Sequence, residues 1–310
     1  MHEFRPDGPR SHSRKFSEYD ERVIAIVSAA NRHGAKSICD RLVAELSPHR
    51  DFRVAVVSSS QEATAAAREA AAAAGVVVAV GGDGTVADVA TGIFGSGAAL
   101  GIVPAGSTNI TARSLGIPTQ LTAAIATLAG PRRVRTIDTG RSADRAFLHI
   151  AGAGFDAELF RHARPAWKRH VGWLAYLPAA AAAARLQPSL VRVTVDKDQI
   201  DVRSSLVLIA NGGSAIAPSF QLYPGIAVDD GWLDVLVFTS VNLVQIAATL
   251  SYAGRQRLDD SPHVIWRRGR NVLIDASPPL GVELDGDLHG ETPRQFQVVP
   301  SGINIVVPPD

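Results

Sequence analysis

A glycine-rich turn carrying one carboxylate lies between a strand-like segment and a helix-like one. The sequence GGDGT at 81–85 follows the apolar run Val76–Val80 and precedes the periodic segment 86–95. A tight turn needs one or two glycines, so the third leaves bare backbone against which a ligand can lie. Such strand-to-helix junctions are where α/β sheets bind anions. A carboxylate is unfavourable beside phosphates unless it holds a metal ion or a sugar hydroxyl. Asp83 therefore indicates chemistry on a magnesium-bound nucleotide.

A second polar turn with a glycine, Val103–Asn109 (VPAGSTN), ends the next apolar strand. Neither turn has the GxxxxGK[ST] signature of a P-loop, and the first lacks the GxGxxG spacing of a dinucleotide-binding turn. Alone, a GDG sequence is more often a turn capped by its own aspartate. Two such turns on adjacent strand ends favour a ligand-binding cleft instead.

Alternating strands and helices are expected to position these turns. Between residue 21 and about Asp138, helical segments alternate with apolar strand-like runs at 22–28, 52–59, 76–80 and 98–104. Continuous apolar strands separated by helices are typical of a parallel sheet covered on both faces. We therefore predict a three-layer α/β domain in the first half of the chain.

The helices of this half carry three local expectations. The segment KSICDRLVAEL places four apolar side chains on one helical face, those of Ile38, Leu42, Val43 and Leu46. The alanine-rich helix QEATAAAREAAAAAG is expected to end at Gly75, because glycine commonly follows a helix end. The segment STNITARSLG is expected to begin a helix with Ser or Thr as its N-cap.

The second half of the chain is rich in strands. After Asp138, β-branched runs are separated by Gly, Asp, Asn and Pro, with helical segments near 167–186 and 241–252. The basic run Trp266–Arg270 is more typical of a turn. We predict a β-rich second domain.

Composition restricts the class of protein. Of the 310 residues, 46% are hydrophobic and 20% charged, as in ordinary globular proteins, and a net charge of +1 argues against a nucleic-acid-binding protein. One cysteine excludes an intramolecular disulfide and fits a reducing cytoplasm. Residues 1–20 lack the apolar core of a secretory signal and are expected to be a flexible tail. No apolar run reaches the ~20 residues of a membrane span. We expect a cytoplasmic protein, and the sequence leaves a homodimer open.

Several motifs together resemble a known family. GGDGT, PAGSTNITARSLGIP, DDGWLDV and LDGD, within a likeness that runs from about Val23 to Pro308, are similar to the bacterial diacylglycerol kinase and sphingosine kinase family of lipid kinases. That family shares its ATP-binding fold with NAD kinases and phosphofructokinases. GGDGT alone does not separate these groups, whereas DDGWLDV and LDGD favour the lipid kinases.

The resemblance implies a domain organisation and two cofactors. After the tail at 1–20, residues 21–138 would form the ATP-binding α/β domain. Residues 139–301 would form a β-sandwich-like domain that takes the lipid alcohol substrate, and a final strand at about 302–308 would return to the first domain. ATP and Mg²⁺ would be the cofactors.

The resemblance also implies site residues. Position by position, the two turns and nearby strand ends would contact ATP through Ser28, Asn31, Ser59, Gly81, Gly82, Asp83, Gly84, Thr85, Asp88, Ser107, Thr108 and Asn109. Asp230 would hold a structural magnesium ion together with main-chain carbonyls near Ala227 and Trp232. The loop after the first strand departs from the family's NPAARRG at Ser28 and Ala29.

The catalytic base is implied at Asp287, with Asp83 as a neighbouring carboxylate. Phosphoryl transfer depends mostly on positioning, with a carboxylate that orients the attacking hydroxyl. The family has glutamate at this place in a DGE sequence, whereas here Asp285-Gly286-Asp287 is one methylene shorter. Aspartate has ~1.5 Å less reach, and a displacement of about 1 Å can cost roughly a hundredfold in rate. The alternative is that DGD is only a turn between strands.

The segment 161–177 interleaves basic and aromatic residues, RHARPAWKRHVGWLAYL. This pattern suits peripheral contact with an anionic surface at the inner face of a membrane, although an ordinary amphipathic helix with a solvated basic face is slightly favoured.

Three functions stay open from the sequence. The first is an ATP- and magnesium-dependent kinase of diacylglycerol or a related lipid alcohol. The second is an NAD kinase-type enzyme with a soluble acceptor. The third is a lipid-binding regulatory protein of this fold with weak or no kinase activity, for which Ser28 and Asp287 are the motivating departures.

Overall fold

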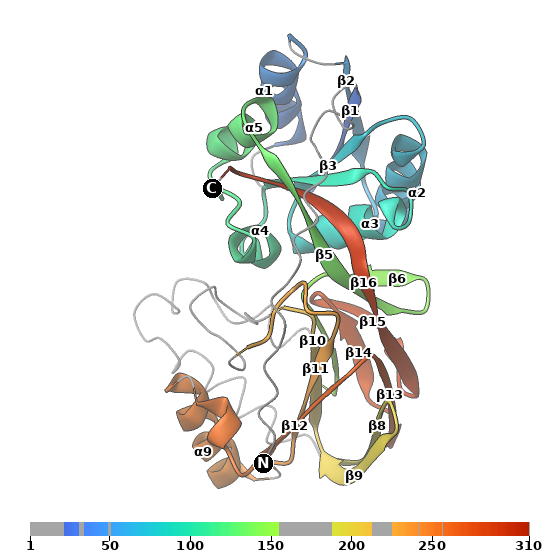
Figure 1. Ribbon diagram of the computed structural model, residues 1–310, viewed down its shortest axis with the longest axis vertical. Helices are drawn as coiled ribbons and strands as arrows, with labels where there is room; N and C mark the ends of the chain where they lie inside the picture. The colour runs from blue at the N-terminus through green and yellow to red at the C-terminus, as the bar shows by residue number, and fades with distance from the viewer. Residues whose placement is uncertain are drawn as a thin grey trace.

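The computed structural model describes residues 22–30, 34–48, 51–154, 188–212, 225–240, 242–255 and 257–309. Figure 1 shows two regions along the long axis, an α/β region at the top and a strand-rich region below. The first region contains β1 (Arg22–Ser28), α1 (Ala35–Leu46), β2 (Asp51–Val57), α2 (Ser60–Ala71), β3 (Val76–Gly81), α3 (Asp83–Ile93), β4 (Ala99–Pro104), α4 (Ile110–Ser114) and α5 (Leu121–Ala129).

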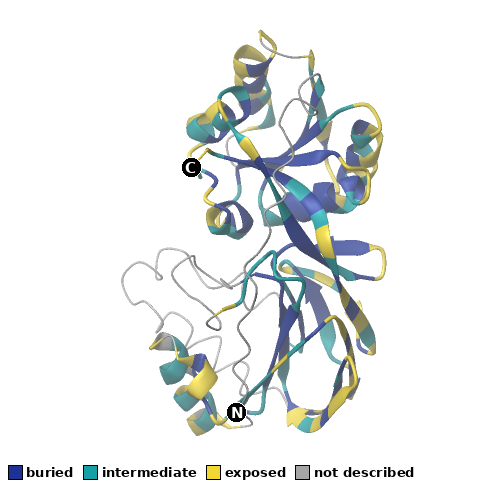
Figure 2. Cartoon of the chain, in the orientation of Figure 1, coloured by how far each residue is buried: buried dark blue, intermediate teal, exposed yellow. Residues whose placement is uncertain are grey.

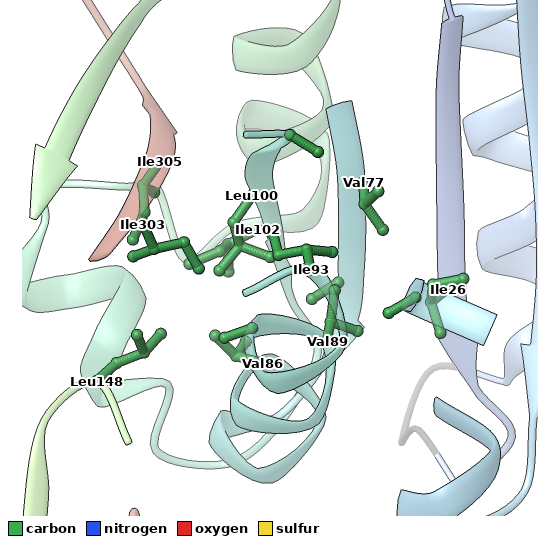
Figure 3. Packing of buried hydrophobic residues seen from close by; sticks show 14 of the residues in the cluster. Ile26, Val77, Val86, Val89, Ile93, Leu100, Ile102, Leu148, Ile303 and Ile305 are labelled. Carbon is green, nitrogen blue, oxygen red and sulfur yellow. The ribbon is translucent and has the colours of Figure 1, made fainter. Parts of the chain in front are cut away.

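The sheet of the first region is parallel in the order β2-β1-β3-β4, with helices on both faces. Alternate side chains of β3 point to opposite faces. Val77 packs in one core with α2 and α3, and Val78 in another with α1 and α5. Figure 3 shows the first of these cores, where Val86 and Val89 of α3 pack towards the sheet. The predicted α/β layers are confirmed.

The second region begins with β5 (Arg133–Ser142), which leads from the first. It contains β6 (Arg145–Phe147), β7 (Ile150–Ala153), β8 (Ser189–Val195), β9 (Asp198–Ser204), β10 (Leu206–Ala210), β11 (Leu233–Phe238), α9 (Leu243–Gly254), the 3₁₀ turn η3 (Leu258–Asp260), β12 (Val264–Gly269), β13 (Asn271–Ser277), β14 (Gly281–Leu284), β15 (Asp287–Glu291) and β16 (Arg294–Val307).

Two sheets pack face to face in this region. Strands β12-β11-β10-β7-β14-β15 form an antiparallel sheet, and β16, β13, β8 and β9 form the facing one. Their shared core contains Ile209 and Val235 from the first sheet and Val193, Ile274 and Phe296 from the second. Figure 2 shows buried residues, in dark blue, along strands of both sheets. The β-sandwich-like fold expected for this region is confirmed.

Strand β16 belongs to both regions. Its first residues pair with β13, and Asn304 and Ile305 pair with β4 of the parallel sheet. It runs antiparallel to β5 with a register shift between Val299 and Ile303. The two regions are therefore joined by continuous backbone hydrogen bonding and not only by a linker, as Figure 1 shows for β5 and β16.

A buried carboxylate holds the chain at this register shift. Asp138 of β5 accepts hydrogen bonds from the backbone N–H of Ser301, at 2.8 Å, and of Gly231, at 2.5 Å. Ser301 lies within the register shift of β16, whereas Gly231 lies just before β11, so one carboxylate binds two segments that are far apart in the chain. Asp138 thus fixes the junction of the two regions.

Four local predictions are wrong. Val43 is 47% exposed, because it lies beside the face that Ile38, Leu42 and Leu46 bury. Helix α2 ends at Ala71, before Gly75. Helix α4 has Asn109 as its N-cap, in the left-handed region and without a side-chain cap. The run expected as a turn at 266–270 is mostly β12, which pairs with β11.

The helix expected near 241–252 is confirmed as α9. The basic and aromatic segment 161–177 lies outside the described residues. Among those that are described, no helix is long and apolar enough to cross a membrane.

Candidate functional site

The glycine turn leaves the N-terminus of α3 open. Gly82 is the N-cap of α3, and the first intrahelical hydrogen bond runs from Val86 N–H to the Gly82 carbonyl. No side chain among the described residues caps this end of the helix. A Cβ at Gly81 would collide with the side chain of Thr85, which folds back over the turn. The unpaired N–H groups and the positive end of the helix dipole favour an anion here.

The two glycine turns are in contact. A Cβ on Gly106 would lie 2.5 Å from the Gly82 Cα, so the second turn has no room for a side chain at Gly106. Asp83 Oδ1 accepts a hydrogen bond of 3.1 Å from Thr111 N–H in the first turn of α4. The aspartate of the first turn therefore caps the helix that follows the second.

Asn109 shapes the second turn from within. It is buried at φ 50°, and its side-chain amide both donates to and accepts from the Gly106 backbone at 3.0 Å. Ser107 and Thr108 are exposed on the same turn. The two hydroxyls are therefore accessible, whereas both polar atoms of the Asn109 side chain are engaged.

The DGD sequence is the turn of the hairpin β14–β15. Asp285 and Gly286 both have positive φ, 49° and 92°, as a two-residue type I′ turn requires, and Leu284 pairs directly with Asp287. DGD is therefore a turn between strands, as the alternative interpretation held. A catalytic role for Asp287 is not excluded, because the same turn fixes the direction in which its side chain projects.

The carboxylate of Asp285 anchors this hairpin. It accepts hydrogen bonds from the N–H groups of Leu148, His149 and Ile150 at 2.7, 3.0 and 3.0 Å. Burial raises the pKa of Asp285 to about 6, against the opposing effect of these three bonds. The Leu148 side chain lies in the core of the first region, near Val86 in Figure 3. Asp285 thus ties the hairpin to the segment 148–150, whose Leu148 side chain packs into the core of the α/β region.

Asp287 and Gly84 meet across the two regions. A Cβ on Gly84 would lie 2.9 Å from Asp287 Oδ2, although the two residues are far apart in the chain. The Asp287 side chain is 45% exposed. The structure therefore brings a half-exposed carboxylate against the open first turn of α3.

Three further groups surround this meeting point. Asp88 of α3 is buried against Arg145 of β6, with Nη1 to Oδ1 at 2.6 Å, and Ser60 donates to the same oxygen at 2.6 Å. Burial raises the pKa of Asp88, while Ser60 and Arg145 oppose that effect. Asp88, predicted to contact ATP, has its Oδ1 occupied within the protein.

Other titratable groups close to the hairpin are perturbed by burial. The pKa of Glu283 in β14 is raised to about 7 by burial and by the negative charges of Asp285 and Asp287. Burial lowers the pKa of His149 to about 4. The pKa of His289 is lowered by burial and then by the charge of Arg145. Burial therefore disfavours the charged form of each of these three side chains.

The predicted structural metal site lies elsewhere, beside Arg268. Asp230 Oδ1 accepts from Trp232 N–H at 3.1 Å, and Oδ2 is buried 3.4 Å from Arg268 Nη2 with no hydrogen-bond donor among the described residues. Burial raises the pKa of Asp230. Within the described part of the chain, no three His, Cys, Asp or Glu side chains are grouped to hold a metal ion.

The remaining predicted residues lie at strand ends of the first region. Ser28 is half-buried at the end of β1. Ser59 is the N-cap of α2, where its hydroxyl accepts from Glu62 N–H at 3.2 Å while Glu62 accepts from Ser58 N–H. Asn31 lies outside the described residues.

Arg145, Ser60 and the anchoring role of Asp285 were not predicted from the sequence. Arg145 and Ser60 belong to no motif, and only the fold brings them to Asp88. For Asp285 a signal was present, since Asp-Gly is the preferred sequence of a tight hairpin turn.

Two family matches cover most of the chain. Residues 22–142 match the diacylglycerol kinase catalytic domain, and residues 149–307 match the YegS C-terminal NAD kinase beta sandwich-like domain. The boundary between them falls beside Arg145, close to where the two regions meet.

Individual relatives agree with this assignment. A diacylglycerol kinase of Bacillus subtilis is 30% identical over 74% of this chain and 77% of its own length. An uncharacterized Synechocystis protein is also 30% identical, and the match covers 54% of its length, about half.

Solved structures show the same fold. A structure from Bacillus anthracis strain Sterne superposes with a TM-score of 0.77 at 23% identity, covering 97% of this chain and 99% of that one. A diacylglycerol kinase from the same organism has a TM-score of 0.72 at 20% identity, over 94% and 98% of the two chains. From the two matched domains and these relatives, the chain belongs to the bacterial diacylglycerol kinase-like family of lipid kinases.

Proposed function

We propose that this protein transfers the γ-phosphoryl group of magnesium-bound ATP to the hydroxyl of diacylglycerol or a related lipid alcohol. In this reaction the lipid oxygen forms a bond to phosphorus, the bond from phosphorus to the β-phosphate oxygen breaks, and ADP leaves. The observation that carries the proposal is the approach of the Asp287 carboxylate to Gly84 in the open turn of α3.

The first region would bind the phosphates. The uncapped N–H groups of α3 are hydrogen-bond donors for phosphate oxygens, and Gly82 and Gly84 leave the backbone accessible. Asp83 is held by Thr111 N–H, which fixes the carboxylate beside the turn. ATP would arrive with its magnesium ion, which neutralises phosphate charge as the leaving group forms.

The second region would supply the base. Asp287 would accept the proton of the lipid hydroxyl as that oxygen attacks phosphorus. Its side chain is shorter than glutamate, but Asp285 anchors the turn that carries it to the backbone of residues 148–150, and a Cβ on Gly84 would still lie only 2.9 Å from Asp287 Oδ2. This geometry argues against loss of function through short reach.

A structural magnesium ion at Asp230 is part of the proposal. The buried Oδ2, which lacks a donor among the described residues, fits a cation ligand, and main-chain oxygens near Ala227 and Trp232 with water would complete the coordination. Arg268 already places positive charge near this oxygen, so the ion and the guanidinium would share it.

Incubation with labelled ATP, magnesium and separate pools of diacylglycerol, sphingoid bases and NAD tests the function. Label in the diacylglycerol pool is expected. Label in the NAD pool alone would contradict the lipid acceptor and favour an NAD kinase-type enzyme. No label in any pool, with lipid still bound, would favour a regulatory protein.

A further inference from the structure

Arg145 is a buried cation fixed by groups of the first region. Its side chain is 8% exposed, and Nη1 lies 2.6 Å from Asp88 Oδ1 and 3.2 Å from Ser60 Oγ. Ser60 Oγ donates to the same Asp88 oxygen. Because the Arg145 guanidinium is buried against Asp88 and also donates to Ser60, it has little freedom to move.

The other end of the same guanidinium reaches the second region. Nη2 of Arg145 lies 3.5 Å from Oδ2 of Asp287, and this is the only ion pair that Asp287 makes with a described residue. A planar guanidinium can hold two carboxylates at once, which a lysine ammonium does less well. Arg145 therefore connects α3, which begins at the glycine turn, to the carboxylate that faces that turn.

The surroundings of Asp287 make this contact matter. The negative charge of Asp287 favours the protonated forms of Asp88, Glu283 and His289, so these three groups lie within its electrostatic reach; Asp285 and Arg294 lie in the same neighbourhood. A half-exposed carboxylate among acids would otherwise turn towards solvent, away from Gly84.

We propose that Arg145 is a positioning residue for phosphoryl transfer. Anchored on Asp88 and Ser60, it holds Oδ2 of Asp287 against Gly84 and leaves Oδ1 free to accept the proton of the acceptor hydroxyl. This inference rests on the proposed function.

The competing role for Arg145 is structural, as the counter-ion of Asp88. Breaking a buried ion pair from one side leaves an uncompensated charge, whereas replacing both partners by neutral groups of similar shape relieves that cost. The pair of variants Arg145→Gln and Asp88→Asn/Arg145→Gln therefore separates the two roles. The exposed pair Arg192–Asp201, at 2.8 Å, gives the matched control Arg192→Gln/Asp201→Asn.

The experiment measures kcat, the KM for ATP and the melting temperature of the full chain with diacylglycerol in mixed micelles. Arg145→Gln is expected to lower both kcat and the melting temperature. The double variant is expected to recover the melting temperature, while its kcat stays at or below about a tenth of wild type with a KM for ATP within threefold, as a displaced base requires. The control pair is expected to leave all three values unchanged.

Recovery of kcat above a tenth of wild type in the double variant would overturn the positioning role, as would a larger rise in the KM for ATP. If the Gln variants do not fold, kcat is measured for Arg145→Lys, because lysine keeps a positive charge beside Asp88. A kcat above a tenth of wild type in this variant would likewise overturn the positioning role. An inactive wild-type protein would instead remove the proposed function itself.

Discussion

The two turns that meet at the site have inverse sequences, Gly82-Asp83-Gly84 and Asp285-Gly286-Asp287. In the first, glycines flank one carboxylate that is tied to the N–H of Thr111. In the second, carboxylates flank one glycine, and Asp285 is tied to three N–H groups. Each turn thus uses one aspartate to bind backbone N–H groups of another segment.

What the turns present to each other is opposite in charge. The first exposes backbone N–H groups at the positive end of a helix, and the second exposes the carboxylate of Asp287. Donors suit the phosphates, and an acceptor suits the hydroxyl that attacks them. Asp83 and Asp285 are structural because they accept hydrogen bonds from backbone N–H groups of other segments, whereas Asp287 faces the open turn at Gly84.

The variant with the largest expected effect removes the carboxylate of Asp287. Asp287→Asn keeps the shape of the turn but cannot accept a proton, so turnover is expected to fall roughly 10²- to 10⁴-fold. ATP binding, followed by calorimetry, is expected to persist because the glycine turn is unchanged. Asp198→Asn, at the exposed start of β9, is the matched control. Unchanged turnover in Asp287→Asn would remove this residue from the mechanism.

A second test concerns Glu283, the buried carboxyl group of β14 beside the hairpin turn. The pKa of Glu283 is raised from 4.5 to about 7, mainly by burial, so the folded state holds the proton more tightly than the unfolded chain does. Its contribution to stability is therefore full below pH 4.5 and is lost as the pH rises through about 7.

Glu283→Gln resembles the protonated side chain at every pH. We expect the variant to be more stable than wild type at pH 8, by on the order of 3 kcal/mol, and equally stable at pH 4. Denaturant unfolding at both pH values measures this. The exposed Glu291→Gln should show no such difference, and a pH-independent effect of Glu283→Gln would contradict the argument.

The variant with the smallest expected effect adds a methyl group between the two turns. In Gly84→Ala the added Cβ would lie 2.9 Å from Asp287 Oδ2, so the half-exposed carboxylate must shift by a few tenths of an ångström. We expect kcat to fall about tenfold, since a displacement of 1 Å costs about a hundredfold. Gly281→Ala, with no atom within 4 Å of the added Cβ, should be silent. Equal kcat values for Gly84→Ala and Gly281→Ala would show that the contact between Gly84 and Asp287 does not affect catalysis.

The sequence was sufficient for the layers and for the two turns. Apolar runs such as β3 and glycines before α3 are local signals, and the alternation of Val76 to Val80 between two cores follows from the strand itself. The meeting of Gly84 with Asp287 could be expected from the family resemblance only, because no local pattern joins residues so far apart.

The partners of the acidic groups could not be predicted. That Asp83 caps α4 and that Asp88 faces Arg145 both depend on how segments far apart in the chain pack. The same limit explains β12, whose basic run resembles a turn until Trp266 Nε1 and Arg268 bond the buried Asp234 of β11.

Strand β16 has a consequence for how the chain is made. Ile303, Ile305 and Val307 complete a core of the first region, yet the ribosome adds them after the entire second region. Until then the edge of β4 lacks its neighbour and presents unpaired backbone groups. The amino-terminal region therefore cannot finish folding during its own synthesis. A gene fragment that encodes it alone should yield an aggregating product unless the β16 segment is supplied.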